Sequence, residues 1–127
     1  MVKWRSVVAK GDDIEDRLIE FAVRIIHVCN KLPDNPAGQH IRGQLLRSGT
    51  SPAPNYGEAR SAESKRDFIH KLRIVLKELN ESRVWLKIII QAELLPEQRM
   101  QPLLDECEQP CRIVSSSIQT ARGKVDG

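Results

Sequence analysis

Apolar side chains recur every three or four residues through four stretches of the chain, which is the spacing that places them along one face of an α-helix. None of these stretches shows the strict alternation typical of a half-buried β-strand. The expected helices span residues 13–32, 37–61, 64–93 and 96–122. Amphipathic helices joined by short links pack most simply as an antiparallel up-and-down four-helix bundle. We therefore expect an all-α fold in a single domain over residues 1–127, with its core from about residue 13 to residue 122.

Three of the four helices carry a seam in which spacings of three and four residues alternate, as in a heptad. The predicted seam positions are Ile14, Leu18, Phe21, Ile25, Val28 and Leu32 in the first helix, Phe68, Leu72, Val75, Leu79, Ser82, Leu86 and Ile89 in the third, and Leu104, Cys107, Cys111, Val114, Ile118 and Ala121 in the fourth. The third helix is also apolar beyond its seam, which predicts contacts with two neighbours or with a second subunit. Ser64 and Asp67 resemble an N-terminal capping arrangement for this helix. Asp12 or Asp13 is the expected N-cap of the first helix.

The second helix is expected to be irregular because two prolines, Pro52 and Pro54, fall inside it. Its apolar face is formed by Ile41, Leu45 and Leu46. A proline within a helix removes a backbone hydrogen bond and costs about 3 kcal/mol. We expect a kink or a short break near residues 51–55, or alternatively a separate second half that begins at Pro52. For the same reason Pro110 is expected to bend or split the fourth helix.

The segment from Leu46 to Ala59 is the most unusual part of the chain, because Gly, Pro, Asn and Glu are dense within a helical stretch. Breaks of local propensity often mark special contacts. In one interpretation, Arg47, Asn55 and Glu58 form a polar contact surface. In the other, which we favour, the segment packs tightly against a neighbouring helix, and Asn55 and Glu58 satisfy backbone groups that the prolines leave free.

The composition bounds the class of protein without defining its function. The 127 residues include 20 basic and 17 acidic side chains, and a formal net charge of +3 does not by itself indicate nucleic-acid binding. No stretch approaches the roughly 18 uncharged apolar residues that a membrane span needs. The apolar stretch at the N-terminus is too short for a secretion signal. We therefore expect a cytoplasmic protein without a membrane partner.

The sequence contains no constellation typical of catalysis. His27, His40 and His70 are scattered, and no zinc-protease motif, glycine-rich phosphate loop or nucleophile elbow is present. We expect no enzymatic activity, no cofactor and no metal. Cys107 and Cys111 share a helix face and are interpreted as small buried core residues. A metal or small-molecule site that uses these cysteines or a histidine is the weaker alternative.

Basic residues gather on the third helix and the segment before it. Residues 60–87 hold eight basic and four acidic side chains, a local excess of four positive charges. Arg66, Arg73 and Lys77 recur at spacings of seven and four, and such a stripe can follow a phosphate backbone. The predicted phosphate contacts are Arg60, Lys65, Arg66, Arg73 and Lys77. A solvated helix face with pairs such as Lys77–Glu81 is the favoured interpretation for a monomer, whereas oligomerisation would multiply the positive surface.

Three segments resemble motifs of a bacterial family of four-helix-bundle proteins, named for reading frames inside intervening sequences of large-subunit rRNA. The motifs are Q-L-L-R-S-G-T-S-x-x-x-N-x-x-E-A at residues 44–59, S-K-x-D-F-I-x-K-L at residues 64–72 and K-E-x-x-E-x-x-x-W-L at residues 77–86. Their order and spacing match, and the resemblance covers the chain from about residue 21 to the end of the fourth helix. The family-motif or interface positions are Arg47, Ser48, Ser51, Asn55, Glu58, Asp67, Phe68, Glu78 and Trp85.

This resemblance implies an up-and-down bundle that assembles into a ring-like homopentamer without enzymatic activity. The chain is also similar to the accessory variability protein of diversity-generating retroelements, a basic pentameric bundle that engages nucleic acid and a reverse transcriptase. It departs from the family pattern at Pro52 and Pro54, at Tyr56, which replaces a small aliphatic residue, and at Pro110. The first dozen residues lack the family's apolar-Trp opening, and we interpret Trp4 as its displaced counterpart.

Our leading hypothesis is a pentameric, non-enzymatic binding protein whose basic surface contacts RNA or other nucleic acid without reading base sequence. Its partners would be further copies of itself and either RNA or a nucleic-acid-handling protein. The scarcity of aromatic residues argues against recognition by base stacking. The rival hypothesis is a protein-interaction scaffold or accessory protein that self-assembles through its second and third helices and binds no nucleic acid.

Overall fold

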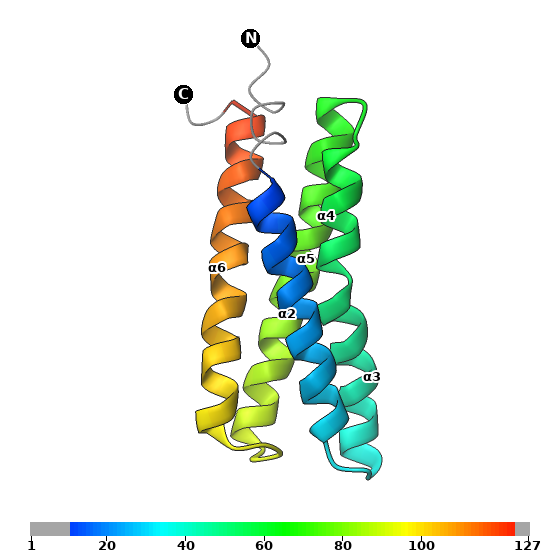
Figure 1. The fold of residues 1–127 in the computed structure, drawn as a ribbon, viewed down its shortest axis with the longest axis vertical. Coiled ribbons are helices and arrows are strands. Elements are labelled where there is room, and N and C mark those ends of the chain that lie inside the picture. Colours follow the sequence, from blue (N-terminus) through cyan, green and yellow to red (C-terminus); the bar gives the residue numbers. More distant parts are fainter. Residues whose placement is uncertain (1–10, 124–127) are drawn as a thin grey trace.

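The computed structural model describes residues 11–123, which form helices joined by short turns. The helices are α2 (Asp12–Lys31), α3 (Pro36–Thr50), α4 (Pro52–Arg60), α5 (Lys65–Gln91) and α6 (Glu97–Ala121). Because α3 and α4 follow one another as two halves of one rod, the bundle has four rods that run alternately up and down (Figure 1). The predicted all-α antiparallel bundle is confirmed. Trp4 lies outside the described residues.

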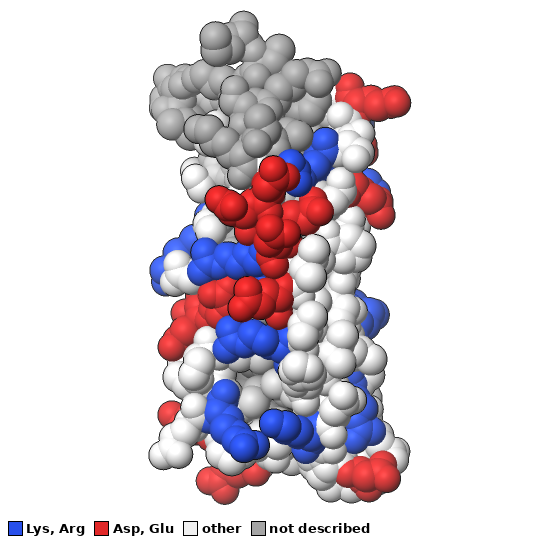
Figure 2. Space-filling model, in the orientation of Figure 1, with Lys and Arg blue, Asp and Glu red and all other residues white. Residues whose placement is uncertain are grey.

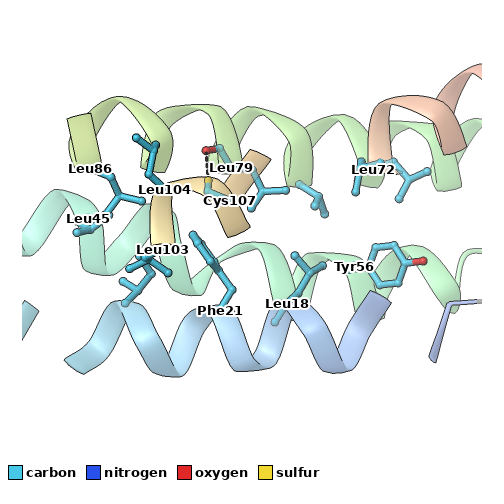
Figure 3. Packing of buried hydrophobic residues seen from close by; sticks show 14 of the residues in the cluster. Leu18, Phe21, Leu45, Tyr56, Leu72, Leu79, Leu86, Leu103, Leu104 and Cys107 are labelled. Carbon is cyan, nitrogen blue, oxygen red and sulfur yellow. Dashed lines mark hydrogen bonds between the residues drawn. The ribbon is translucent and has the colours of Figure 1, made fainter. Parts of the chain in front are cut away.

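The core is built around α5, which packs against α3, α4 and α6. Its seam agrees with the sequence at every predicted position: the buried residues include Phe68, Leu72, Val75, Leu79, Ser82, Leu86 and Ile89. Figure 3 shows side chains from all the rods converging on this seam, with Leu79 and Leu86 of α5 facing the layer that contains Phe21. Full burial of a side chain of this size contributes about 1.5–3 kcal/mol.

The seam of α2 differs from its prediction at Val28. Leu18, Phe21 and Ile25 are buried as expected, but Cys29 is buried in place of Val28, which is only partly covered. The next predicted position, Leu32, is buried, so the spacing from Ile25 to Leu32 is four then three rather than three then four, and the seven-residue repeat is kept. The N-cap prediction is also wrong, because the cap is Gly11, which makes no side-chain capping bond.

The predicted kink in the second rod is confirmed. The rod bends by 19° between its two halves, and Pro52 is the first residue of α4. The backbone nevertheless stays helical through Ser51, whose N–H donates to the Arg47 carbonyl (3.2 Å) and whose carbonyl accepts from the Asn55 N–H (3.2 Å). Leu46, which we placed on the apolar face of this rod, is instead 40% exposed.

Two prolines lie inside α6, yet the helix is continuous from Glu97 to Ala121. Of the two outcomes expected at Pro110, the split is therefore wrong, and the bend stays a prediction. Each proline removes one hydrogen bond of the ladder, and packing of an amphipathic helix against its neighbours can outweigh that local cost. Pro110 is itself buried against the bundle. Among the described residues no helix is long and apolar enough to cross a membrane.

Two glycines of α3 give a matched pair for testing how closely this rod packs. A Cβ at Gly49 would lie 2.7 Å from both Cγ1 and Cγ2 of Ile25, whereas a Cβ at Gly43 would meet nothing within 4 Å. We expect Gly49→Ala to destabilise the protein by about 1–3 kcal/mol through overpacking. Gly43→Ala should stabilise it by about 0.5–1 kcal/mol, because alanine loses less backbone freedom on folding. Urea unfolding followed by circular dichroism measures both, and equal effects would contradict the close α2–α3 approach.

Candidate functional site

Several motif residues meet where α3 crosses α5. Arg47 of α3 forms an ion pair with Glu78 of α5 (3.0 Å) and another with Glu81 one turn further on. Glu81 also accepts a hydrogen bond from the indole nitrogen of Trp85 (3.1 Å). The rings of Trp85 and His40 meet in a T-shaped arrangement, with their centroids 5.9 Å apart. This polar cluster joins the first and third family motifs across a helix interface.

Beneath that cluster, the two helices approach through small side chains. The hydroxyl oxygens of Ser48 and Ser82 are buried and lie 2.9 Å apart. Ser82 also bonds to the carbonyl of Glu78 (3.0 Å), so its hydroxyl has partners on both helices. Serine at both positions therefore lets the rods pack closely without an unsatisfied polar group.

The remaining polar residues of the unusual segment also have partners inside the bundle. The Asn55 amide donates to the carbonyl (3.0 Å) and the hydroxyl (2.9 Å) of Ser51, at the bend of the rod. The carbonyls that lose their amide partners to prolines are those of residues 48 and 50, so Asn55 braces the bend rather than replacing those bonds. Glu58 pairs with Lys71 of α5 (2.7 Å), and this pairing raises the pKa of the lysine.

The capping arrangement at the start of α5 is confirmed. The side chain of Ser64 accepts a hydrogen bond from the backbone N–H of Asp67 (3.0 Å). Phe68 follows as the first buried residue of the seam. The second family motif thus fixes where α5 begins and which face it buries.

Arg60 is already engaged within the bundle. It pairs with Asp12 (2.6 Å) and Glu15 (3.2 Å) of α2, and its side chain is only 23% exposed. The hydrogen bond to Asp12, reinforced by Glu15, raises the pKa of the guanidinium. A phosphate would have to displace two carboxylates to reach it. We therefore leave Arg60 out of the candidate contact surface.

The other predicted cations converge on one hollow, which we call the basic hollow. It has a volume of about 540 Å³ and is lined by Lys65, Arg66, Ile69, His70 and Arg73 of α5 and by Arg122, which follows α6. Four of these residues are cations, and no acidic side chain is among the lining residues that the structure describes. None of the four forms an ion pair with an acid in the described range 11–123. Lys77 lies exposed further along α5, outside the hollow.

The charge pattern elsewhere makes this cluster distinctive. On the face that carries α2, Lys and Arg side chains alternate with groups of Asp and Glu (Figure 2). Ion pairs such as Arg17–Glu106 (2.7 Å) account for part of that mixture. The basic hollow instead gathers cations from α5 and from the end of α6, and within residues 11–123 no carboxylate forms an ion pair with them. His70 and Arg122 were not among the predicted contacts, although the start of one antiparallel helix necessarily lies beside the end of the next.

The cysteines of α6 occupy different environments. Cys107 is buried and hydrogen-bonds to the Leu79 carbonyl (3.3 Å; Figure 3), whereas Cys111 lines a second hollow of about 490 Å³. The interaction with the neighbouring thiol raises the pKa of Cys107 and lowers the pKa of Cys111, and the positive charge of Arg83 adds to the lowering at Cys111. Within residues 11–123 no group of three or more His, Cys, Asp or Glu side chains is placed to hold a metal ion.

These features define a class of protein, the small all-helical bundle that carries a cluster of basic side chains on its surface. The chain belongs to the 23S rRNA-intervening sequence protein family, whose sequence model matches residues 13–116. It is also similar to the crystal structure of a protein with unknown function from the S23 ribosomal protein family of Bacteroides thetaiotaomicron. The two chains are 35% identical, the match covers 84% of this chain and 98% of the other, and the TM-score is 0.79. No curated protein matches the chain. The family predicted from the three motifs is confirmed.

The cysteine environments predict selective alkylation. Cys29 is buried, and burial raises its pKa to about 11, while Cys107 is buried with its pKa also raised. We expect iodoacetamide near pH 8 to modify Cys111 first, because a lowered pKa means more thiolate at that pH. Cys107→Ala should move the pH profile of Cys111 alkylation to higher pH, and Cys29→Ala should not. Peptide mass spectrometry over a pH series measures the rates, and faster reaction at Cys107 would contradict this assignment.

Proposed function

We propose that this protein is a non-enzymatic, oligomeric binding protein that contacts RNA through the basic hollow and the adjoining surface of α5. The observation that carries the proposal is the convergence of Lys65, Arg66, Arg73 and Arg122 on one surface without described acidic partners. Cations that are not neutralised inside the protein are free to replace the counterions of a phosphate backbone. The name of the family, which refers to rRNA, is consistent with such a ligand.

The proposed recognition is electrostatic rather than sequence-specific. Aromatic residues make up 4% of the chain, and His70 is the single ring among the residues that line the hollow. A surface of this kind contacts phosphates and positions a strand, but it offers few groups that read base edges. Four cations in one subunit bind RNA weakly on their own, and several copies in one assembly would act together.

Self-assembly is supported by exposed aliphatic residues. Val84 and Ile88 lie one turn apart on α5 and are 48% and 38% exposed. The sequence assigned assembly to the second and third helices, and Leu46 and these two residues lie on those helices. A further stripe at Ile19, Val23 and Ile26 of α2 was not predicted. Single exposed aliphatics are common, but repeats at helical spacing favour an interface. The subunit number of five rests on the family resemblance.

We also propose a cytoplasmic location. The described cysteines are all free thiols, which is usual in a reducing compartment, and an RNA ligand would be found there. The rival function is a scaffold that binds protein through the same aliphatic stripes and does not bind RNA. The stripes favour that rival as strongly as they favour self-assembly, so RNA binding is the property that separates the two.

RNA binding is tested with a fluorescein-labelled single-stranded 20-mer and a salt titration followed by anisotropy. We expect log affinity to fall linearly with log salt, with a slope of about 0.7 per phosphate contacted. Arg66→Glu with Arg73→Glu should weaken binding by at least about tenfold and make the slope shallower by about 1–2. The control is Lys31→Glu with Arg99→Glu, which changes net charge equally at exposed positions near the opposite end of the bundle.

If both double variants weaken binding alike, net charge rather than the basic hollow is responsible. If the unaltered protein shows no affinity at low salt, the scaffold function replaces the RNA-binding function.

Assembly is tested by light scattering. The chain mass is 14.4 kDa, and we expect a value near five times that mass. Val84→Glu with Ile88→Glu should give a species near the chain mass with its helical circular dichroism retained, because a charge buried in an apolar interface is costly. Gln109→Glu with Gln119→Glu, at exposed sites on α6, adds the same charge and should leave the assembly intact. A value near the chain mass for the unaltered protein would remove oligomerisation from the proposal.

A further inference from the structure

We propose that the basic hollow is a binding site for one nucleotide phosphomonoester, either the terminal nucleotide of an RNA strand or a free mononucleotide. This inference deepens the proposed function and rests on the same surface. It adds that the protein distinguishes the end of a strand from its interior. Three properties of the hollow carry it: its volume, the number of cations around it, and its partly apolar lining.

The volume fits a small molecule better than a passing backbone. A phosphate backbone can be held by a stripe of cations on a convex helix surface. The basic hollow, at about 540 Å³, is within the range of about 300–1,000 Å³ that small-molecule sites occupy. It is formed where the beginning of α5 meets the end of α6, so its cations approach a bound group from two helices.

The number of cations fits a phosphomonoester better than a phosphodiester. An internal phosphodiester carries one negative charge, whereas a phosphomonoester carries about 1.5–2 at neutral pH and offers three strong acceptor oxygens. Lys65 and three arginines surround the hollow, and the lining residues that the structure describes include no acid. The planar guanidinium of arginine donates two parallel hydrogen bonds to a phosphate. A terminal phosphate is therefore the nucleic-acid group that best matches this concentration of charge.

The lining also offers a place for one nucleoside. Ile69 is partly buried and packs on the core, and His70 is exposed beside it. An aliphatic side chain and an imidazole ring can contact a ribose and one base, since aromatic rings support a base by stacking. Among the described residues, no second ring lines the hollow, so they offer no platform for a run of stacked bases.

The basic face of α5 offers further phosphate contacts to an RNA strand whose terminal nucleotide lies in the basic hollow. Arg66, His70, Arg73 and Lys77 follow one another at spacings of four, three and four, so they share one face of α5. Lys77 lies one turn beyond Arg73, which is about 6 Å along the helix axis. With the terminal nucleotide in the hollow, the next phosphate would reach Lys77. A free mononucleotide would not.

The test compares decamers of one sequence that carry a 5′-phosphate, a 3′-phosphate or hydroxyls at both ends. Adenosine monophosphate, adenosine and inorganic phosphate are added as competitors. We expect one end-phosphorylated decamer to bind at least about tenfold more tightly than the decamer without end phosphates. Arg122→Ala should reduce that ratio to near one, because it removes a cation of the hollow without altering α5. Lys77→Ala should weaken all decamers alike and leave adenosine monophosphate binding unchanged, and Lys31→Ala is the control for loss of a distant cation.

The possible results separate the inference from the function on which it rests. A preference for one end phosphate that Arg122→Ala abolishes supports an RNA end as the ligand. Competition by adenosine monophosphate but not adenosine, without an end preference, supports a free nucleotide. Salt-dependent binding of all decamers with neither effect overturns the inference and leaves RNA binding in place. Binding of adenosine monophosphate without any decamer binding overturns RNA binding and leaves the nucleotide site. Circular dichroism of Arg122→Ala verifies that the variant is folded.

Discussion

Burial of one seam along the whole of α5 is the constraint from which the other elements take their positions. Phe68 near its start and Ile89 near its end are both fully buried, so other rods must cover this 27-residue helix over its full length. The rod formed by α3 and α4 achieves that length only by continuing through Pro52. The 19° bend is the consequence, because a proline inside a rod tilts the helix axis where packing does not allow the helix to end.

Where the helices meet, ion pairs join most of the interfaces. Arg47 links α3 to α5, Lys71 links α5 to α4, Arg60 links α4 to α2, and Arg17 links α2 to α6. Between α2 and α3, Arg42 donates instead to backbone carbonyls. The α5–α6 interface has no ion pair among the described residues; Cys107 joins it through the Leu79 carbonyl. The basic hollow lies at this α5–α6 interface, at which no ion pair joins the two helices within residues 11–123.

The sequence predicted the features that depend on residues close together along one helix. It did not predict contacts between residues that are far apart in the sequence. The seam of α5 followed from spacing alone, because a helix with neighbours along its whole length must bury every seam position. The role of Arg60 did not follow, since its partners Asp12 and Glu15 are 48 and 45 residues away in the sequence. Arg122 was missed for the same reason. The topology of the bundle places Arg122 beside the start of α5. The spacing of residues along a single helix cannot predict a neighbour on another helix.

The aliphatic stripe of α5 and the basic hollow occupy different parts of the same helix. Arg73 and Ile88 are 15 residues apart, which is about 22 Å along the axis. Contacts at Val84 and Ile88 would leave the hollow open in an assembly. In the proposed ring of identical subunits, cyclic symmetry would place the hollows at one level along the ring axis, where their cations would repel one another. An anionic ligand would relieve that repulsion, so the proposed RNA binding and the proposed assembly would strengthen each other rather than compete.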